Sequence, residues 1–123
     1  MPRFPRTNRF PQMLILFDHG TPSPLRPFLQ GHTVKKTKDL GWNRLTNGEL
    51  LTEAEAAGFD LLLTTDKNIG HQQNLAGRRI AIVVLGNPRW PVLRLHVQQV
   101  VSAINAATPG CYVIVDTPGE EPK

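Results

Sequence analysis

Two apolar runs, each followed by an aspartate, constrain the fold of this chain more than any other feature. Residues 13–17 are uninterrupted apolar residues that end before Asp18, and residues 61–63 are three leucines separated from Asp66 by two threonines. A strand covered on both faces has no polar side, so such runs predict buried strands of a parallel sheet. The carboxyl ends of parallel strands meet at one edge, where open α/β sheets bind ligands. Asp18 and Asp66 are therefore candidate site residues, and the alternative for Asp66 is that it only caps the next helix.

The remaining hydrophobic pattern alternates between strand and helix signals. Besides 13–17 and 61–65, strands are expected at 80–85 and 111–115, with a short edge strand at 32–34, and helices at 46–58, 69–75 and 91–104. A short helix after Pro24 is expected to face the core with Leu25, Phe28 and Leu29. The order β-α-β-α-β-α-β-α-β predicts a layered α/β fold with a mostly parallel sheet and right-handed crossovers.

The helix expected before the second apolar run has clear start and stop signals. Thr46 and Glu49 match a capping box, in which each side chain accepts a hydrogen bond from the backbone of the other residue. Gly58 supplies the stop signal. The buried stripe of this helix is expected to consist of Leu50, Ala54 and Ala57. Glu49 therefore has a structural role available, although it also lies at the helix end nearest the loop edge of the sheet.

The net charge is weak support for a polyanionic partner. The sequence has 14 basic and 10 acidic residues, but three arginines lie in the first twelve residues, which leaves 11 basic against 10 acidic residues from Met13 onward. Local basic clusters at 35–38 and 78–79 could meet phosphates. For each cluster, solvated surface is the favoured interpretation.

The two ends of the chain are expected to lie outside the folded domain. Residues 1–12 hold three prolines and no periodicity, which predicts a flexible arm, followed by a domain at 13–117 and a tail at 118–123. Met13 is a candidate biological start, and the alternative is that the basic arm grips nucleic acid. The arm lacks the apolar segment of a signal peptide, and no apolar run approaches the roughly 20 residues of a membrane span. With a single cysteine, Cys111, a cytoplasmic location is expected.

The acidic residues at the strand ends are the strongest functional signal. No glycine-rich dinucleotide or phosphate-binding fingerprint follows the first strand, and the four histidines lack metal-ligand spacing. Neighbouring carboxylates repel each other unless a cation offsets their charge, and a hard divalent ion prefers oxygen ligands. The candidate ligands are Asp18, Asp66 and Glu49, with Asn47 and Asn68 as neutral oxygen donors. Mg²⁺ or Mn²⁺ at such a site activates water and stabilises charge on a phosphodiester, which is nuclease chemistry.

Three segments of the chain resemble PIN-like proteins of the small VapC-type toxin group. They are Leu-Phe-Asp18, Asn47-Gly-Glu49-Leu-Leu and Leu-Leu-Thr-Thr-Asp66-Lys-Asn68, and the similarity covers residues 13–85. The resemblance implies a compact three-layer α/β/α sandwich and a metal-dependent ribonuclease that acts as the toxin of a toxin–antitoxin pair. It further implies that Asp18 is the first acid of the metal site and Asp66 the acid after the threonines.

Two positions depart from the pattern of this group. Asn47 and Asn68 stand where the group commonly has aspartates, so the metal site has lost up to two charges. Fewer carboxylates weaken the binding of a hard cation. The first hypothesis is a Mg²⁺- or Mn²⁺-dependent endoribonuclease. Its metal ligands are Asp18, Asp66, Glu49, Asn68 and Asn47, and its phosphate contacts are Lys67 and Arg44.

The sequence leaves other functions and the partners open. The ribonuclease hypothesis implies RNA, single-stranded or tRNA-like, and a cognate antitoxin as partners, with a homodimer as a further expectation. The second hypothesis is a non-catalytic PIN-like binding module with a degenerate metal site. A small-molecule-binding module is least favoured, because no ligand fingerprint is present. Trp42 and Trp90 could serve an interface, but a core position is favoured for both.

Overall fold

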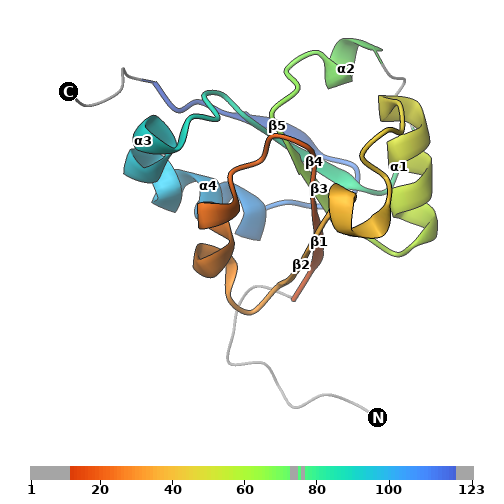
Figure 1. Ribbon diagram of the computed structural model, residues 1–123, viewed down its shortest axis with the longest axis horizontal. Coiled ribbons are helices and arrows are strands. Elements are labelled where there is room, and N and C mark those ends of the chain that lie inside the picture. The colour runs from red at the N-terminus through yellow and green to blue at the C-terminus, as the bar shows by residue number, and fades with distance from the viewer. Residues whose placement is uncertain (1–11, 73–74, 76, 119–123) are drawn as a thin grey trace.

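The protein has a five-stranded parallel sheet (Figure 1). The computed structural model describes residues 12–72, 75 and 77–118. In spatial order the strands are β2 (Thr33–Lys36), β1 (Leu14–Phe17), β3 (Leu61–Thr64), β4 (Ala81–Leu85) and β5 (Tyr112–Val115). Every neighbouring pair is parallel. The prediction of an α/β fold with a mostly parallel sheet is confirmed, and β2 is the edge strand that the pattern indicated.

Short helices connect the strands. They are η1 (Ser23–Leu29), η2 (Thr37–Leu40), α1 (Asn47–Ala56), α2 (Ile69–Gln72), α3 (Trp90–Leu93), η3 (Arg94–His96) and α4 (Val97–Asn105). η1 is a 3-10 helix that contains Pro27, whose missing N–H cannot donate a helical hydrogen bond. The single helix expected at 91–104 consists of α3, η3 and α4 in succession. None of the helices in the described ranges has the length and apolar character needed to cross a membrane.

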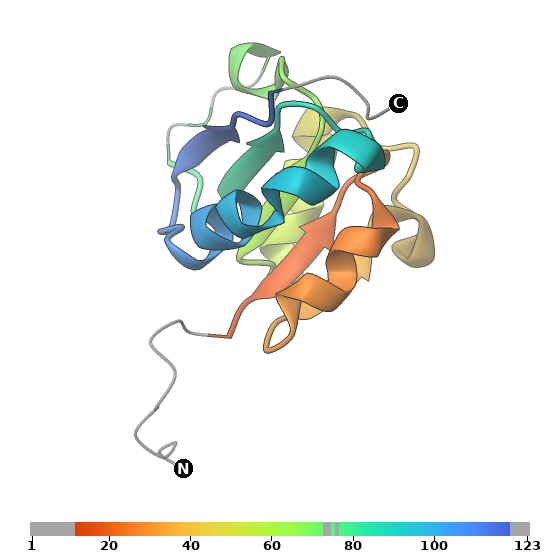
Figure 2. The same cartoon turned by 90° about the vertical axis from the view of Figure 1, so that its left-hand side faces the viewer.

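Apolar side chains pack on both faces of the sheet. One face, called the η1 face here, is covered by η1, α3 and α4, and the other, the α1 face, is covered by α1 and α2 (Figures 1 and 2). Alternate strand residues serve the two faces, as in Phe17 on the η1 face and Leu16 on the α1 face. The four strand residues of β3 are all buried, because this strand is central and covered on both sides.

Three details of the predicted core are corrected by the structure. Leu25 and Leu29 are buried as expected, but Phe28 is 48% exposed and instead contacts the half-buried ring of Trp90, with the ring centroids 6.3 Å apart. In α1, Leu51 is buried and Ala57 is exposed. Ala57 is the C-cap of α1 and follows the last residue of the helix. Both tryptophans are half-buried and pack against the core clusters.

The crossover connections do not all have the same hand. η1 connects β1 to β2 and α4 connects β4 to β5, and both pack on the η1 face, although the two connections run toward opposite edges of the sheet (Figure 2). Connections that cross one face in opposite directions have opposite hands. The β2–β3 and β3–β4 connections cross the α1 face toward β5, so they share the hand of β1–β2. Because right-handed crossovers are strongly preferred, we assign β4–β5 as left-handed, and the prediction of right-handed crossovers is wrong there.

Helix α1 begins and ends with the signals that the sequence contains. Thr46 and Glu49 form the expected capping box. At the other end the Gly58 N–H donates to the Glu55 carbonyl and the Phe59 N–H to the Ala54 carbonyl, which is the pattern of a Schellman motif. Gly58 has a φ of 87°, a value that favours glycine. The two motifs fix the two ends of α1, and Asn47 in its first turn contacts Asp66 at the carboxyl edge of the sheet.

Glu55 ties the last turns of α1 to the start of β4. Its carboxylate accepts hydrogen bonds from the backbone N–H groups of Arg79 (2.6 Å) and Ile80 (3.2 Å), and it forms an ion pair of 2.7 Å with Arg78. Burial by itself raises the pKa of Glu55, but the hydrogen bonds from Arg79, Arg78 and Ile80 outweigh it and hold this pKa below its ordinary value of 4.5. The carboxylate is therefore more stable in the folded than in the unfolded chain.

Candidate functional site

The two predicted aspartates lie at the carboxyl ends of two neighbouring strands. Asp18 directly follows β1, and its N–H donates to the Leu63 carbonyl of β3 (2.9 Å). Asp66 follows β3 after one intervening residue. The chain leaves β1 toward the η1 face and leaves β3 toward the α1 face. In doubly wound sheets ligands bind at such a switch point, which for the strand order 2-1-3-4-5 lies between β1 and β3.

The loop after Asp18 is held against the end of β3. The Thr21 hydroxyl donates to the Leu63 carbonyl (3.0 Å), and the Thr21 N–H donates to the Asp18 carbonyl (3.1 Å). Gly20 has a φ of 89°, and a Cβ atom there would lie 3.2 Å from the Thr65 hydroxyl. Glycine thus allows the tight turn and the close approach of the two strand ends.

A buried hydroxyl links the two strand ends. Thr64, whose side chain is fully buried, donates its hydroxyl hydrogen to Asp18 Oδ2 (2.7 Å) and accepts a hydrogen bond from the Asp66 N–H (3.1 Å). The Thr64 hydroxyl therefore fixes the position of the Asp18 carboxyl group. The sequence analysis treated Thr64 as part of the strand and missed this role, because periodicity does not show where a hydroxyl points.

The capping role and the site role of Asp66 coexist in the structure. Asp66 Oδ1 accepts a hydrogen bond from the Asn68 N–H (2.9 Å), which organises the turn before α2. The other carboxylate oxygen, Oδ2, accepts a hydrogen bond from Asn47 Nδ2 (2.7 Å) at the start of α1. The structure therefore brings together Asn47 and Asp66, which are separated by 19 residues in the chain.

Glu49 forms the capping box rather than a third carboxylate beside the other two. Its Oε1 atom accepts hydrogen bonds from the Thr46 N–H (2.9 Å) and the Thr46 hydroxyl (3.1 Å). These bonds, the backbone bond first, lower the pKa of Glu49. Within the described ranges no group of three or more His, Cys, Asp or Glu side chains is arranged to hold a metal ion. The assignment of Glu49 as a ligand stays a prediction.

The donors at the switch point fit a hard divalent cation in chemical type. Each carboxylate oxygen of Asp18 and Asp66 accepts a hydrogen bond from the protein, and the donor to Asp18 Oδ1 is the His19 N–H (2.7 Å). A carboxylate oxygen has two lone pairs, so acceptor capacity remains while the orientation is fixed. Mg²⁺ commonly binds proteins through one or two carboxylates and keeps several waters. Two oriented aspartates are therefore a sufficient protein contribution, and the asparagines supply further neutral oxygen donors.

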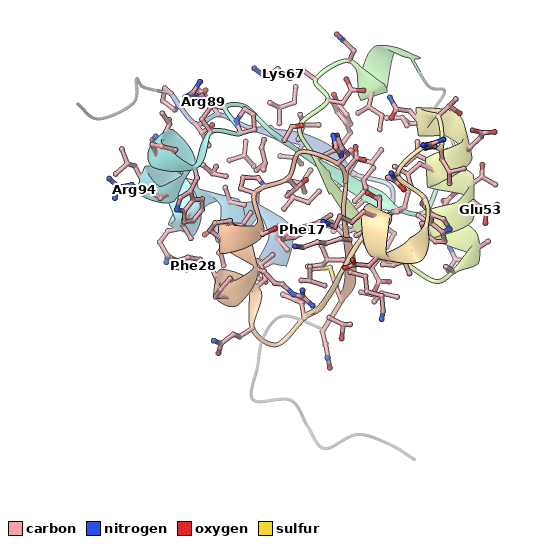
Figure 3. All side chains as sticks on the ribbon, viewed as in Figure 1. Phe17, Phe28, Glu53, Lys67, Arg89 and Arg94 are labelled. Carbon is pink, nitrogen blue, oxygen red and sulfur yellow. The ribbon has the colours of Figure 1, made fainter. Side chains whose placement is uncertain are left out.

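The remaining predicted residues are exposed to solvent. Lys67 is exposed between Asp66 and Asn68, and its side chain points outward (Figure 3). Asn68 is exposed too, and only its backbone contact with Asp66 is established. Arg44 is exposed in the turn that leads into α1. Phosphate contacts by Lys67 and Arg44 therefore stay predictions for solvent-facing side chains.

No family model, no curated protein and no solved structure matches this chain. The assignment to PIN-like proteins accordingly stays a resemblance carried by three sequence segments.

Proposed function

We propose that this protein is a Mg²⁺- or Mn²⁺-dependent endoribonuclease with its site between the carboxyl ends of β1 and β3. The observation that carries the proposal is the arrangement around Thr64. A buried hydroxyl fixes Asp18 and the Asp66 backbone, and Asn47 orients the Asp66 side chain. Helix capping accounts for the hydrogen bond that one oxygen of Asp66 accepts. It does not account for the hydrogen bond from the buried Thr64 hydroxyl to Asp18. Oriented carboxylates at a switch point are the expected form of a metal site.

Each residue has a distinct role in this proposal. Asp18 and Asp66 hold the cation, and Asn47 positions Asp66 by donating a hydrogen bond to it. A divalent cation bound there activates water and stabilises negative charge on the phosphodiester. Glu49 and Asn68 are additional ligand candidates. Lys67 and Arg44 contact the RNA backbone from the rim.

Thr64 acts as a positioning residue in the proposed site. Its hydroxyl donates a hydrogen bond to Asp18 Oδ2 and so holds this oxygen in one position. Since Thr64 is buried, water does not replace this bond readily. The protein therefore offers an oriented ligand without rearrangement, which is the condition for precise placement of a metal and its substrate.

A specific observation also favours a second candidate, a non-catalytic PIN-like binding module. All four carboxylate oxygens of Asp18 and Asp66 have hydrogen-bond partners within the protein, and Glu49 is engaged in its capping box. These bonds can serve structure alone. In that case the strand ends stay as they are without a cation, and the protein acts only through its surface.

Thermal unfolding with and without Mn²⁺ separates the two candidates. A ligand that binds only the folded state stabilises it by about 2.7 kcal/mol at one hundred times its Kd. The ribonuclease proposal expects a Tm that rises with Mn²⁺ concentration in the wild type and a lost response in Asp18→Asn. Thr33→Val, on the exposed part of β2, is the matched control and should respond like the wild type. An equal response of wild type and Asp18→Asn would favour the binding module.

The proposal extends to the cellular setting implied by the resemblance. The protein acts in the cytoplasm on single-stranded or tRNA-like RNA as the toxin of a toxin–antitoxin pair, and a cognate antitoxin and a homodimer are proposed partners. Cys111 is half-buried and forms no disulfide in the described part of the chain, in keeping with a reducing compartment. Co-purification of the natively expressed protein with an acidic partner, or with one that neutralises its activity, would support the proposed antitoxin.

A further inference from the structure

A small pocket lies beside Asp18 at the carboxyl ends of β1 and β2. Its volume is about 110 Å³. It combines three basic side chains with hydroxyl groups, and Asp18 forms part of its wall. The lining includes His19, Thr21, Ser23, Lys36 and Lys38. The pocket therefore shares a residue with the proposed cation site but has a different chemical character.

Lys36 reaches this pocket because of the register between β1 and β2. Phe17 and Lys36 are paired neighbours, and Val34, two residues before Lys36, packs on the η1 face. Paired residues of parallel strands share a face, so Lys36 points toward η1, where its Nζ donates to the Ser23 hydroxyl (2.7 Å). Lys35 points to the opposite face and is exposed. Two lysines that are adjacent in sequence thus have different environments.

Lys36 forms no ion pair with a carboxylate of the described residues, among which the ion pair found is that between Arg78 and Glu55. Lys36 is half-buried, and a neutral hydroxyl uses only one of its three N–H donors. A half-buried ammonium that no described carboxylate contacts directly favours an anion at the same position. Asp18 repels such an anion, so the anion belongs on the side of Lys36 and Ser23.

We infer that this pocket binds one phosphate group of an RNA strand, next to the phosphodiester held at Asp18 and Asp66. Pockets for whole drug-sized ligands have volumes of roughly 300 to 1,000 Å³, so this one suits a single phosphate. Lys36 is the main contact, Ser23 positions it, and Lys38 adds charge at the exposed rim. The inference rests on the proposed function for the identity of the anion, and it assigns a substrate contact that the sequence analysis interpreted as solvated surface.

Equilibrium binding without catalysis tests the pocket. The probe is a short fluorescent single-stranded 2′-O-methyl oligoribonucleotide, which resists cleavage. Its binding constant is measured by fluorescence anisotropy in the presence of chelator, over a series of salt concentrations. Each lost phosphate contact on a single strand lowers the slope of log K against log salt by about 0.7. Lys36→Gln should show this loss, and Lys35→Gln, which removes the same charge from the same strand, should keep the wild-type slope. Ser23→Ala should weaken binding in the same direction as Lys36→Gln.

The outcomes separate this inference from the proposed function. An equal loss of slope in Lys36→Gln and Lys35→Gln would overturn the assignment of a phosphate site to this pocket, since general electrostatic attraction would then account for the binding. Stabilisation by inorganic phosphate that depends on Lys36, without oligoribonucleotide binding, would overturn the RNA assignment. Metal-dependent cleavage of unmodified RNA by the wild type is measured in parallel, and its absence would refute the nuclease while a Lys36-specific slope still supports the phosphate contact. Circular dichroism and Tm confirm that all variants are folded.

Discussion

Replacing Thr64 by valine tests the central arrangement of the site with little change in side-chain volume. Valine keeps the branched shape and strand preference of threonine and removes only the hydroxyl. Asp18 Oδ2 then loses its donor at 2.7 Å, and the Asp66 N–H loses its acceptor at 3.1 Å. Because the Thr64 side chain is fully buried, water cannot take its place without opening the packing around β3.

The size of the effect follows from the two bonds. Net hydrogen bonds to charged groups contribute about 1.5 to 3 kcal/mol, and Asp18 is half-buried so that part of its loss is recovered by solvent. We expect Thr64→Val to lower the free energy of unfolding by about 2 kcal/mol, or the Tm by roughly 6 to 10 °C for a domain of this size. The Mn²⁺ response proposed for the wild type should also weaken, because Asp18 is no longer held in place.

Urea unfolding and thermal unfolding of Thr64→Val and two control variants, each compared with the wild type, test this prediction. Thr64→Ser keeps the hydroxyl and loses a methyl group, so it should be destabilised by about 1 kcal/mol through packing and keep its Mn²⁺ response. Thr33→Val changes the same residue type at an exposed position of β2 and should be near wild type. A Thr64→Val protein with wild-type stability and a wild-type Mn²⁺ response would refute the reasoning.

Three other substitutions probe contacts around the sheet. Glu55→Gln should lower the free energy of unfolding by about 1 to 3 kcal/mol at pH 7. Since the pKa of Glu55 is lowered in the folded state, this loss should shrink as the pH falls below the ordinary pKa of 4.5. Urea unfolding at pH 7 and pH 3 measures it, and an equal loss at both pH values would contradict the prediction. Asn47→Ala removes the donor to Asp66 and should cost about 1 kcal/mol and weaken the Mn²⁺ response, as measured by Tm. His32→Ala breaks the link from the amino end of β1 to Asn105 in α4 and should cost about 1 to 2 kcal/mol in urea unfolding, whereas an unchanged midpoint would show that solvent replaces both bonds.

Much of the fold could be predicted because local signals and burial agree along the chain. The apolar runs before Asp18 and Asp66 became central strands, and the capping box at Thr46 and the stop at Gly58 formed as the residue types dictate. Phe28 could not be placed correctly, because α-helical spacing was assumed where the chain forms a 3-10 helix, and the ring of Phe28 lies against Trp90 and is partly exposed. The opposite hand of the β4–β5 connection depends on which face accepts α4, and hydrophobic periodicity does not encode that choice.

The site was predicted in part. The positions of Asp18 and Asp66 after two apolar runs predicted that they lie at one edge of the sheet. Asn47 was also predicted as a site residue, and it contacts Asp66. The hydroxyl bridge of Thr64 was missed, although a threonine at the end of an otherwise leucine-only strand is the signal that marks it. Lys36 was missed because a run of lysines looks like surface, and only the alternation of strand faces separates its environment from that of Lys35.

Cleavage of single-stranded RNA by the purified protein tests the central claim most directly. The assay compares Mn²⁺ with chelator and the wild type with Asp18→Asn and Asp66→Asn, all verified as folded. The account predicts cleavage that requires the metal and is lost in both variants, because two oriented aspartates hold the cation. A folded wild-type protein that neither cleaves RNA nor gains stability from Mn²⁺ would contradict the account, and Asp18 and Asp66 would then serve only to fix the strand ends.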